Sequence, residues 1–242
     1  MVYDPERYRN ASQAHLQADK VPPHFSFELG WADMPMRQAI LGLMTELGRQ
    51  TMNLRVMPTA RLLYVRSLRE GDGIVGWGGV DAEFNPRYPE VFSLFVRPDY
   101  RTYTLGLLIE LARYTYLLDR GIERAYARMD RASNYALLEY RITHGLFQPM
   151  EPASLDPAYV SLCHGCELYG GDCADQAYFL VDVRTFVRHG ENRIGRVDVS
   201  EMPRIFELRP EIIRRSPRLP VLPSAGPPDG GVGRTAFKPH WL

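Results

Sequence analysis

The stretch from 91 to 106 constrains this chain most, because an apolar run there leads directly into a helix start. Residues 91–96 are apolar and rich in β-forming side chains, which predicts a central strand. Pro98 ends that strand, and a Leu-rich helix is expected over roughly 104–119, with Gly121 as its C-cap residue. A buried strand thus delivers a short loop into a helix N-terminus, where unpaired amides and the helix dipole favour an anion.

Two residues of this loop suit the binding of a phosphate group. The guanidinium of Arg101 can make a charge-assisted hydrogen bond to a phosphate oxygen. Gly106 has no side chain, so the backbone there can approach an anion closely. The segment therefore predicts an anion site.

Four elements are expected before the central strand. Alternating apolar residues predict a strand over 24–29. A helix follows, with Asp33 as its N-cap residue and apolar side chains at helical spacing as far as Leu47. The segments 61–67 and 74–80 are joined by a Gly-containing turn and predict a β-hairpin.

Three further elements are expected after the helix that ends at Gly121. A strand is predicted over 124–129, and a helix capped by Ser133 or Asn134 is predicted to end near Gly145. A late strand is predicted over 178–187. Because hairpins and crossover helices alternate, the expected fold class is α/β, with a mixed, mostly antiparallel sheet flanked by helices.

The chain is expected to hold one folded domain with an extension at each end. Hydrophobic residues make up 45% and charged residues 24% of the 242 residues, the balance of a globular protein rather than a disordered one. Residues 1–23 are polar and predict an irregular lead-in, whereas 24–192 carries the predicted elements. Residues 193–242 are rich in Pro and Arg and predict an extended tail, draped on the domain or mobile.

Segment 74–147 resembles the GNAT superfamily of acyl-CoA acyltransferases. That family places a hairpin before a strand of the form V-x-P-x-Y-R, which is followed by R-x-x-G-x-G and a helix. The matching residues here are Val96, Pro98, Tyr100, Arg101 and Gly106. The later residues Asn134, Tyr140, Gly145, Leu146 and Phe147 are similar to the family's closing N…Y…GF segment. The resemblance implies a GNAT-like sheet and an activity on acyl-CoA.

The resemblance also implies which residues bind acyl-CoA. The loop amides and Arg101 would hold the pyrophosphate, and the backbone of the central strand would pair with the pantetheine arm. The residues implied are Leu94, Phe95, Val96, Arg101, Thr102, Tyr103, Thr104, Leu105, Gly106 and Asn134. Two departures from the family pattern stand out. Thr104 replaces the first glycine of R-x-x-G-x-G, and Tyr140 lies about one residue out of register with the glycine that follows it.

The expected chemistry is direct acyl transfer to an amine, for which a base and an acid are needed. Glu90 is the best-placed base, with Asp81 and Glu83 as alternatives, although each carboxylate would also suit a solvated strand end. The resemblance implies that Tyr140 protonates the thiolate; a half-buried packing tyrosine is the other interpretation. A strand N–H near Phe95 would polarise the thioester oxygen.

The three cysteines form a compact cluster near the end of the domain. Cys163, Cys166 and Cys173 have the spacing of metal ligands, and a zinc site would take its fourth ligand from His164, His144 or His189. Reduced thiols in a loop are the alternative, and a redox pair is a third.

The composition of the sequence limits which binding partners and which cellular compartment are expected. The formal net charge is +0, so the overall charge gives no support for nucleic-acid binding. The sequence has no apolar run long enough for a spanning helix and no signal-peptide core, which predicts a cytoplasmic protein that does not bind membranes. The oligomeric state is left open, a homodimer included.

The predicted function is an N-acyltransferase that moves an acyl group, acetyl by preference, from acyl-CoA to a small-molecule or protein amine. Two alternatives remain at this stage. One is an enzyme similar to N-acyl amino acid synthases that takes its acyl group from a carrier protein. The other is a GNAT-like binding or assembly module without catalysis.

Overall fold

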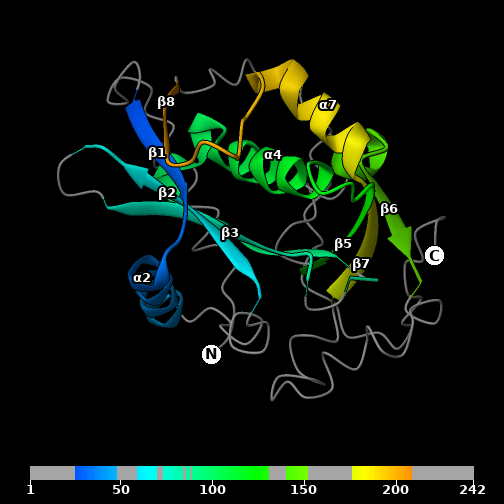
Figure 1. The fold of residues 1–242 in the computed structure, drawn as a ribbon, viewed down its shortest axis with the longest axis horizontal. Helices are drawn as coiled ribbons and strands as arrows, with labels where there is room; N and C mark the ends of the chain where they lie inside the picture. The colour runs from blue at the N-terminus through cyan, green and yellow to red at the C-terminus, as the bar shows by residue number, and fades with distance from the viewer. Residues whose placement is uncertain are drawn as a thin grey trace, which may run out of the picture. The chain divides into compact units, whose positions relative to one another are not determined.

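An eight-stranded sheet organises the residues that the computed structural model describes (Figure 1). Those residues are 25–47, 59–69, 73–83, 86–87, 89–130, 140–151 and 176–208. The strands are β1 (Phe25–Trp31), β2 (Arg61–Ser67), β3 (Ile74–Asp81), β4 (Glu90–Val96), β5 (Arg124–Asp130), β6 (Phe147–Met150), β7 (Gln176–Asp182) and β8 (Arg204–Leu208). Their order across the sheet is β6-β7-β5-β4-β3-β2-β1-β8.

Within the described residues, every neighbouring pair of strands in the sheet is antiparallel except one. β4 and β5 run parallel, because helix α4 (Leu105–Leu118) connects them as a crossover. The predicted fold class is therefore confirmed: the sheet is mixed, mostly antiparallel and flanked by helices.

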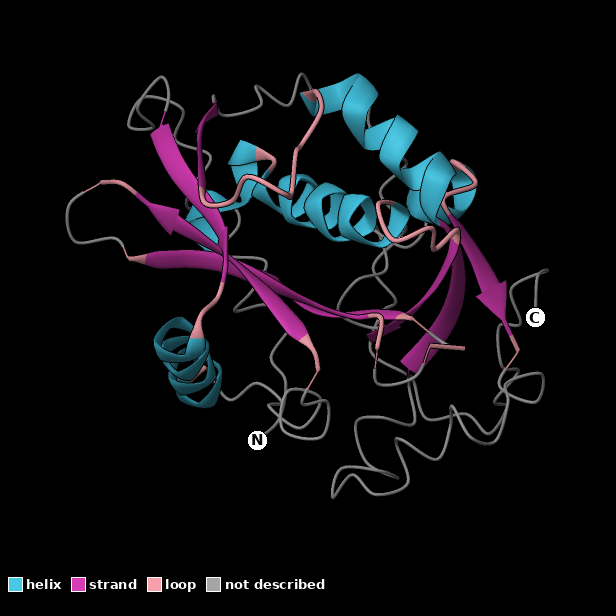
Figure 2. Cartoon of the chain, viewed as in Figure 1, coloured by secondary structure: helices cyan, strands magenta, loops and turns pink. Residues whose placement is uncertain are grey.

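Helices cover both faces of the sheet, as Figure 2 shows. α4 and α7 (Val183–Ile194) lie together on one face, and α2 (Met34–Glu46) lies on the other. The core under α4 and α7 includes Ile109 and Phe186, whereas the core under α2 includes Ile40 and Trp77. None of the described helices is long and apolar enough to cross a membrane.

The predicted helix after β1 is confirmed, and its start has a local cause. The Asp33 carboxylate accepts a hydrogen bond from the backbone N–H of Met36 at 2.9 Å, which satisfies one of the unpaired amides of the first turn. Pro35 occupies the first turn, where its missing N–H costs no hydrogen bond.

One sequence prediction is wrong in part. The strand predicted over 178–187 ends at Asp182, and residues 183–187 begin helix α7 instead. Asp182 accepts a hydrogen bond from the N–H of Thr185 at 2.7 Å, so it caps the helix. The β-branched residues here favour a strand locally, but Val183, Phe186 and Val187 are buried at helical spacing and pack on the core.

Two strands were not predicted. β6 follows the helical turn at 140–143 and pairs with β7. β8 lies inside the predicted extension 193–242 and pairs antiparallel with β1, so this part of the extension belongs to the sheet. Of the helix predicted from Ser133 or Asn134, only the part from Tyr140 falls within the described residues. The lead-in 1–23 and residues 209–242 lie outside them.

Glycines in β3 let α4 lie close against the sheet. A Cβ atom on Gly78 would lie 2.6 Å from Cγ2 of Ile109 and 3.1 Å from Nε of Arg113. A Cβ atom on Gly76 would lie 3.1 Å from Cδ1 of Ile109. The distance between α4 and the sheet is therefore set by the absence of side chains on this strand.

We predict that Gly78→Ala lowers the free energy of unfolding by about 1–3 kcal/mol, the usual cost of overpacking a core. Gly42→Ala is the matched control, because a Cβ there meets no atom within 4 Å and Gly42 lies within α2. The control should gain about 0.5–1 kcal/mol from helix propensity. Urea unfolding followed by circular dichroism measures both values. Equal stability of Gly78→Ala and wild type would contradict the close packing of α4.

Candidate functional site

The site begins where β4 separates from β5. Within the described residues these strands pair at two positions, Glu90 with Tyr126 and Val91 with Ala127. Beyond them β4 contains one extra residue relative to β3, and Ser93 has a φ of 52°. Such a β-bulge bends a strand and increases its twist. Among the described residues, the second half of β4 pairs with β3 alone and not with β5.

A buried arginine supports the bulge from α4. Nη1 of Arg113 donates to the carbonyl oxygens of Gly79 at 3.1 Å and of Phe92 at 2.9 Å. The side chain is 2% exposed, and this burial lowers the pKa of Arg113, although a guanidinium remains charged. The bulge thus depends on a charge that is held inside the core.

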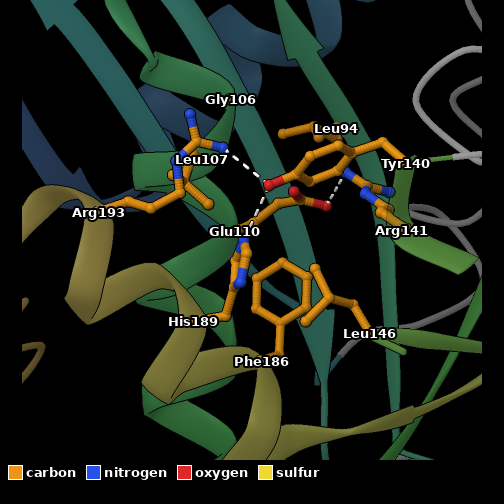
Figure 3. A pocket seen from close by; sticks show the side chains of 10 residues that line it. All are labelled: Leu94, Gly106, Leu107, Glu110, Tyr140, Arg141, Leu146, Phe186, His189 and Arg193. Carbon is orange, nitrogen blue, oxygen red and sulfur yellow. Dashed lines mark hydrogen bonds and ion pairs between the residues drawn. The ribbon is translucent and has the colours of Figure 1, made fainter. Parts of the chain in front are cut away.

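A pocket lies on the α4–α7 face beside this separation (Figure 3). Its walls come from β4, the first turns of α4, the segment 140–146 and α7. The lining residues are Leu94, Gly106, Leu107, Glu110, Tyr140, Arg141, Leu146, Phe186, His189 and Arg193. Four segments that are distant in sequence therefore build one cavity.

Charged groups lie buried against the inner wall of the pocket. Glu110 forms an ion pair with Nη2 of Arg141, and Nη2 of Arg113 lies 3.8 Å from the same carboxylate. The three side chains are 2–7% exposed. Two guanidinium groups and one carboxylate leave an excess of one positive charge, which favours an anionic ligand in a site of low dielectric constant.

Three polar side chains meet at the outer part of the pocket. Oη of Tyr140 lies 3.1 Å from Nε2 of His189, and Nη1 of Arg193 donates to the same oxygen at 3.2 Å. Partial burial lowers the pKa of His189, and the charges of Arg193 and His144 lower it further. Each of these effects favours the neutral form of the imidazole.

The predicted anion loop forms a 3-10 helix, η2 (Pro98–Tyr103), that leads into α4. Arg101 is exposed, and its Nε donates to the carbonyl of Val96 at 3.2 Å. Thr104 joins the two helices with φ 57° and ψ 13°, the left-handed conformation that glycine adopts most easily. The threonine at this motif position thus carries backbone strain that a glycine would avoid.

Gly106 lies in the first turn of α4 and lines the pocket. A Cβ atom on Gly106 would meet one neighbour within 4 Å, Cγ2 of Val96 at 3.9 Å. Packing within the described protein therefore does not require a glycine here. The missing side chain leaves space beside the first turn of α4, and the role of Gly106 in binding an anion stays a prediction.

The other predicted acyl-CoA residues lie in different surroundings. Leu94 lines the pocket together with Gly106, whereas Phe95 points to the α2 face and stacks on Trp77 at a centroid distance of 4.3 Å. Leu105 is fully buried and Val96 nearly so. The remaining predicted residues are Thr102 and Tyr103, which belong to η2, and Asn134, which lies outside the described residues.

Glu90 does not line this pocket, but it has an unusual environment. Its side chain is 2% exposed, and Oε1 accepts a hydrogen bond from Nε of Arg128 at 2.6 Å. Oε2 is buried and makes no hydrogen bond in the part of the chain that the structure describes. Burial raises the pKa of Glu90; the charge of Arg128 opposes this rise, and Asp81 adds to it.

The alternative carboxylates have other roles within the described chain. Asp81 is buried and accepts hydrogen bonds from Oγ1 of Thr59 at 2.9 Å and from the N–H of Glu83 at 2.9 Å. Glu83 is exposed. Both therefore resemble turn and surface carboxylates more than Glu90 does.

The predicted zinc ligands Cys163, Cys166 and Cys173 lie outside the described residues, so the zinc prediction stays a prediction. The described ranges contain no group of three or more His, Cys, Asp or Glu side chains that would hold a metal ion. His144 and His189, named above as ligand candidates, both lie beside Tyr140.

Several solved structures are similar to this chain in fold. A GNAT-family acetyltransferase from Staphylococcus aureus has a TM-score of 0.48 at 10% identity, over 65% of this chain and 99% of that one. An IAA acetyltransferase from Bacillus cereus has a TM-score of 0.45 at 13% identity, over 64% and 99%. N-acetylglutamate synthase from Neisseria gonorrhoeae, complexed with coenzyme A and N-acetyl-glutamate, has a TM-score of 0.42 at 15% identity, over 64% and 35%.

No protein-family model matches the sequence, and no curated protein matches it. The element order on which the resemblance rests is present in the structure, as the hairpin β2–β3, the central strand β4, the helix α4 and the parallel strand β5.

Sequence reasoning missed most of the charged groups around the pocket. The leucines of α4 predict the helix but do not point to Glu110 and Arg113. A carboxylate and a guanidinium three residues apart in an otherwise apolar helix indicate a buried ion pair, and this spacing is the signal in the sequence. Arg193 is the first residue of the predicted extension 193–242, in which the sequence predicts no site residue, whereas the structure places it in α7. Arg141 gave no signal of its own.

We predict that Arg113→Met lowers the free energy of unfolding by about 3–5 kcal/mol, because it leaves the buried carbonyl groups of Gly79 and Phe92 without their hydrogen-bond donor and removes one of the two positive charges beside Glu110. Arg184→Met is the matched control. The ion pair of Arg184 with Glu123 is 61% and 65% exposed, and its loss should cost at most about 1 kcal/mol. Denaturant titration measures both variants. A loss below about 1 kcal/mol in Arg113→Met would show that the bulge does not need this arginine.

Proposed function

We propose that this protein is an N-acyltransferase that moves an acyl group, acetyl by preference, from acyl-CoA to an amine. The observation that carries the proposal is the bulged, separated end of β4, which opens onto a pocket beside the N-terminus of α4. A strand edge, a helix N-terminus and a positively charged inner wall together suit an amide-bearing chain that ends in a pyrophosphate.

Each part of the pocket would contact a different part of the donor. Within the described residues the pairing of β4 with β5 stops at Val91, so the main chain near Leu94 suits the amides of the pantetheine arm, whereas the carbonyl of Val96 already accepts a hydrogen bond from Arg101. The amides at the start of α4 and the exposed side chain of Arg101 suit the pyrophosphate. The apolar side chains of Leu107, Leu146 and Phe186 provide packing for methylene groups.

The acid and base candidates lie on different sides of the sheet. Tyr140 lines the pocket on the donor side. Glu90 shares with Phe92 the strand face that packs toward α2, since alternate residues of a strand point the same way. An amine that approaches from the α2 side would then meet the base, while the thiolate leaves toward the acid.

Glu90 and Tyr140 together supply the two proton transfers that the proposed reaction needs. The amine nitrogen attacks the thioester carbon, a C–N bond forms, and Oε2 of Glu90 accepts the proton that the nitrogen loses. The C–S bond breaks, the electron pair remains on sulfur, and sulfur takes the hydroxyl proton of Tyr140. Glu90 then releases a proton to solvent, and Tyr140 takes one up. Because Oε1 is held by Arg128, Oε2 is the oxygen available to accept the proton.

We predict that acetyl-CoA binds and raises the melting temperature, because a ligand that binds only the folded state stabilises it. Arg101→Ala should weaken acetyl-CoA binding by about 1.5–3 kcal/mol, the range for hydrogen bonds to charged groups. Calorimetric titration measures this, with Arg184→Ala as the control arginine away from the pocket. Binding of acylated carrier protein without acetyl-CoA would favour a carrier-dependent enzyme. Binding of neither would point to a module without catalysis.

We predict that Glu90→Gln lowers turnover by about 10²–10⁴-fold, the usual contribution of a general base. The wild-type rate should rise with pH as Glu90 loses its proton. Because burial raises the pKa of Glu90, this rise should fall at higher pH than for an ordinary glutamate, and it should vanish in the variant. Thiol release during an amine screen is the assay, and Glu83→Gln is the exposed control. Turnover of Glu90→Gln close to wild type would remove it as the base.

A further inference from the structure

Two side chains of α7 converge on the hydroxyl of Tyr140. We propose that His189 and Arg193 are positioning residues that direct the phenol hydrogen of Tyr140 into the pocket and stabilise the phenolate that forms when it is donated. This inference rests on the proposed acyl transfer, and it adds α7 to the machinery that the sequence motif covers. Figure 3 shows the three side chains meeting beside Glu110.

The direction of the hydrogen bonds follows from the chemistry of the donors. Arginine has only N–H donors, so Nη1 of Arg193 donates to Oη of Tyr140 across 3.2 Å. The same oxygen lies 3.1 Å from Nε2 of His189. When the imidazole carries its hydrogen on Nε2, both acceptor positions of the phenol oxygen are engaged. The phenol hydrogen then points away from both side chains and is free to meet the leaving thiolate.

The same two donors act after the proton has left. As the C–S bond breaks, sulfur takes the hydroxyl hydrogen of Tyr140, and a negative charge remains on Oη. Two N–H groups that already point at this oxygen stabilise the charge without reorganising. Solvent returns a proton to the phenolate once the products leave, so His189 and Arg193 end the cycle unchanged.

Packing alone does not explain these residues. Other contacts hold α7 on α4. The ring centroids of Phe186 and Tyr114 lie 4.2 Å apart, and a Cβ atom on Gly190 would lie 2.9 Å from Cδ1 of Leu111. Arg193 is exposed. The hydrogen bonds of α7 to Tyr140 therefore serve the pocket rather than the core.

Several titratable and charged groups surround the imidazole. From segment 140–146 these are Tyr140, Arg141 and His144, whose ring lies 6.0 Å from that of His189. Glu110 reaches the pocket from α4. The remaining titratable or charged groups next to His189 in sequence are on α7 itself: Arg188, Glu191 and Arg193. Protonation of His189 at low pH would leave its Nε2 hydrogen in place, so acid does not remove this donor.

The kinetic test is a double-mutant cycle with acetyl-CoA, measured by thiol release to the amine found in the screen or to water. His189→Leu should lower kcat about 10–100-fold and leave KM for acetyl-CoA within about twofold. The reason is that the oxygen that accepts this hydrogen bond becomes charged only in the transition state, so the lost donor raises the barrier and not the free energy of binding. His189→Gln retains an N–H donor and should recover most of the rate. Arg188→Gln, on the same helix outside the pocket, should match wild type.

The decisive arm adds His189→Leu to Tyr140→Phe. If His189 acts through Tyr140, the His189→Leu change should not lower the rate of Tyr140→Phe any further. If His189 has a structural role instead, the change should lower the rates of the wild type and of Tyr140→Phe by the same factor. An additive loss, or failure of His189→Gln to recover activity, would overturn the proposal.

Nitrogen NMR of the His189 ring tests the geometry without turnover. The proposal expects the hydrogen on Nε2 and a changed Nε2 chemical shift in Tyr140→Phe; a hydrogen on Nδ1 would overturn it.

Calorimetry with acetyl-CoA distinguishes failure of the proposed function from failure of this inference. No binding would overturn the proposed function and this inference with it. Normal binding and turnover with an unchanged rate in His189→Leu would overturn this inference alone.

Discussion

The interaction on which the rest of the site depends is the hydrogen bonding of Arg113 to the carbonyl groups of Gly79 and Phe92. A bulge in the middle of a sheet leaves main-chain acceptors unpaired, and burying them without a partner is costly. Arg113 satisfies them from α4, and the glycines of β3 make room for it. The bulge then turns β4 away from β5 and opens the strand edge beside the pocket.

The same arginine links the fold to the electrostatics of the pocket. Glu110 lies one helical turn before it and pairs with Arg141, which follows the proposed acid Tyr140 in the chain. The carboxylate therefore joins the supported bulge to the segment that carries the acid. An ion cluster of this kind contributes little net stability when its desolvation is counted, but removing one member is expensive. Its role is to fix the position of segment 140–146 against α4.

Acid and base are proposed in unlike environments, as their tasks require. Tyr140 is held by donors, which suits a group that must lose a proton and carry a negative charge. Glu90 is buried with one oxygen bound by Arg128 and the other unpaired within the described residues, which suits a group that must accept a proton. Burial raises the pKa of Glu90 and so moves its titration toward neutral pH.

The sequence by itself determined the local elements: the capped helix after Asp33, the hairpin, the strand 91–96 and the helix that begins after a phosphate-type loop. These follow from period, capping and turn chemistry, which act between near neighbours. Only the tertiary structure decided the end of β7 at Asp182, the return of β8 to β1, and the meeting of Tyr140 with His189 and Arg193. Burial of one face turned β-branched residues into helix α7, and contacts about fifty residues apart leave no periodic trace in a sequence.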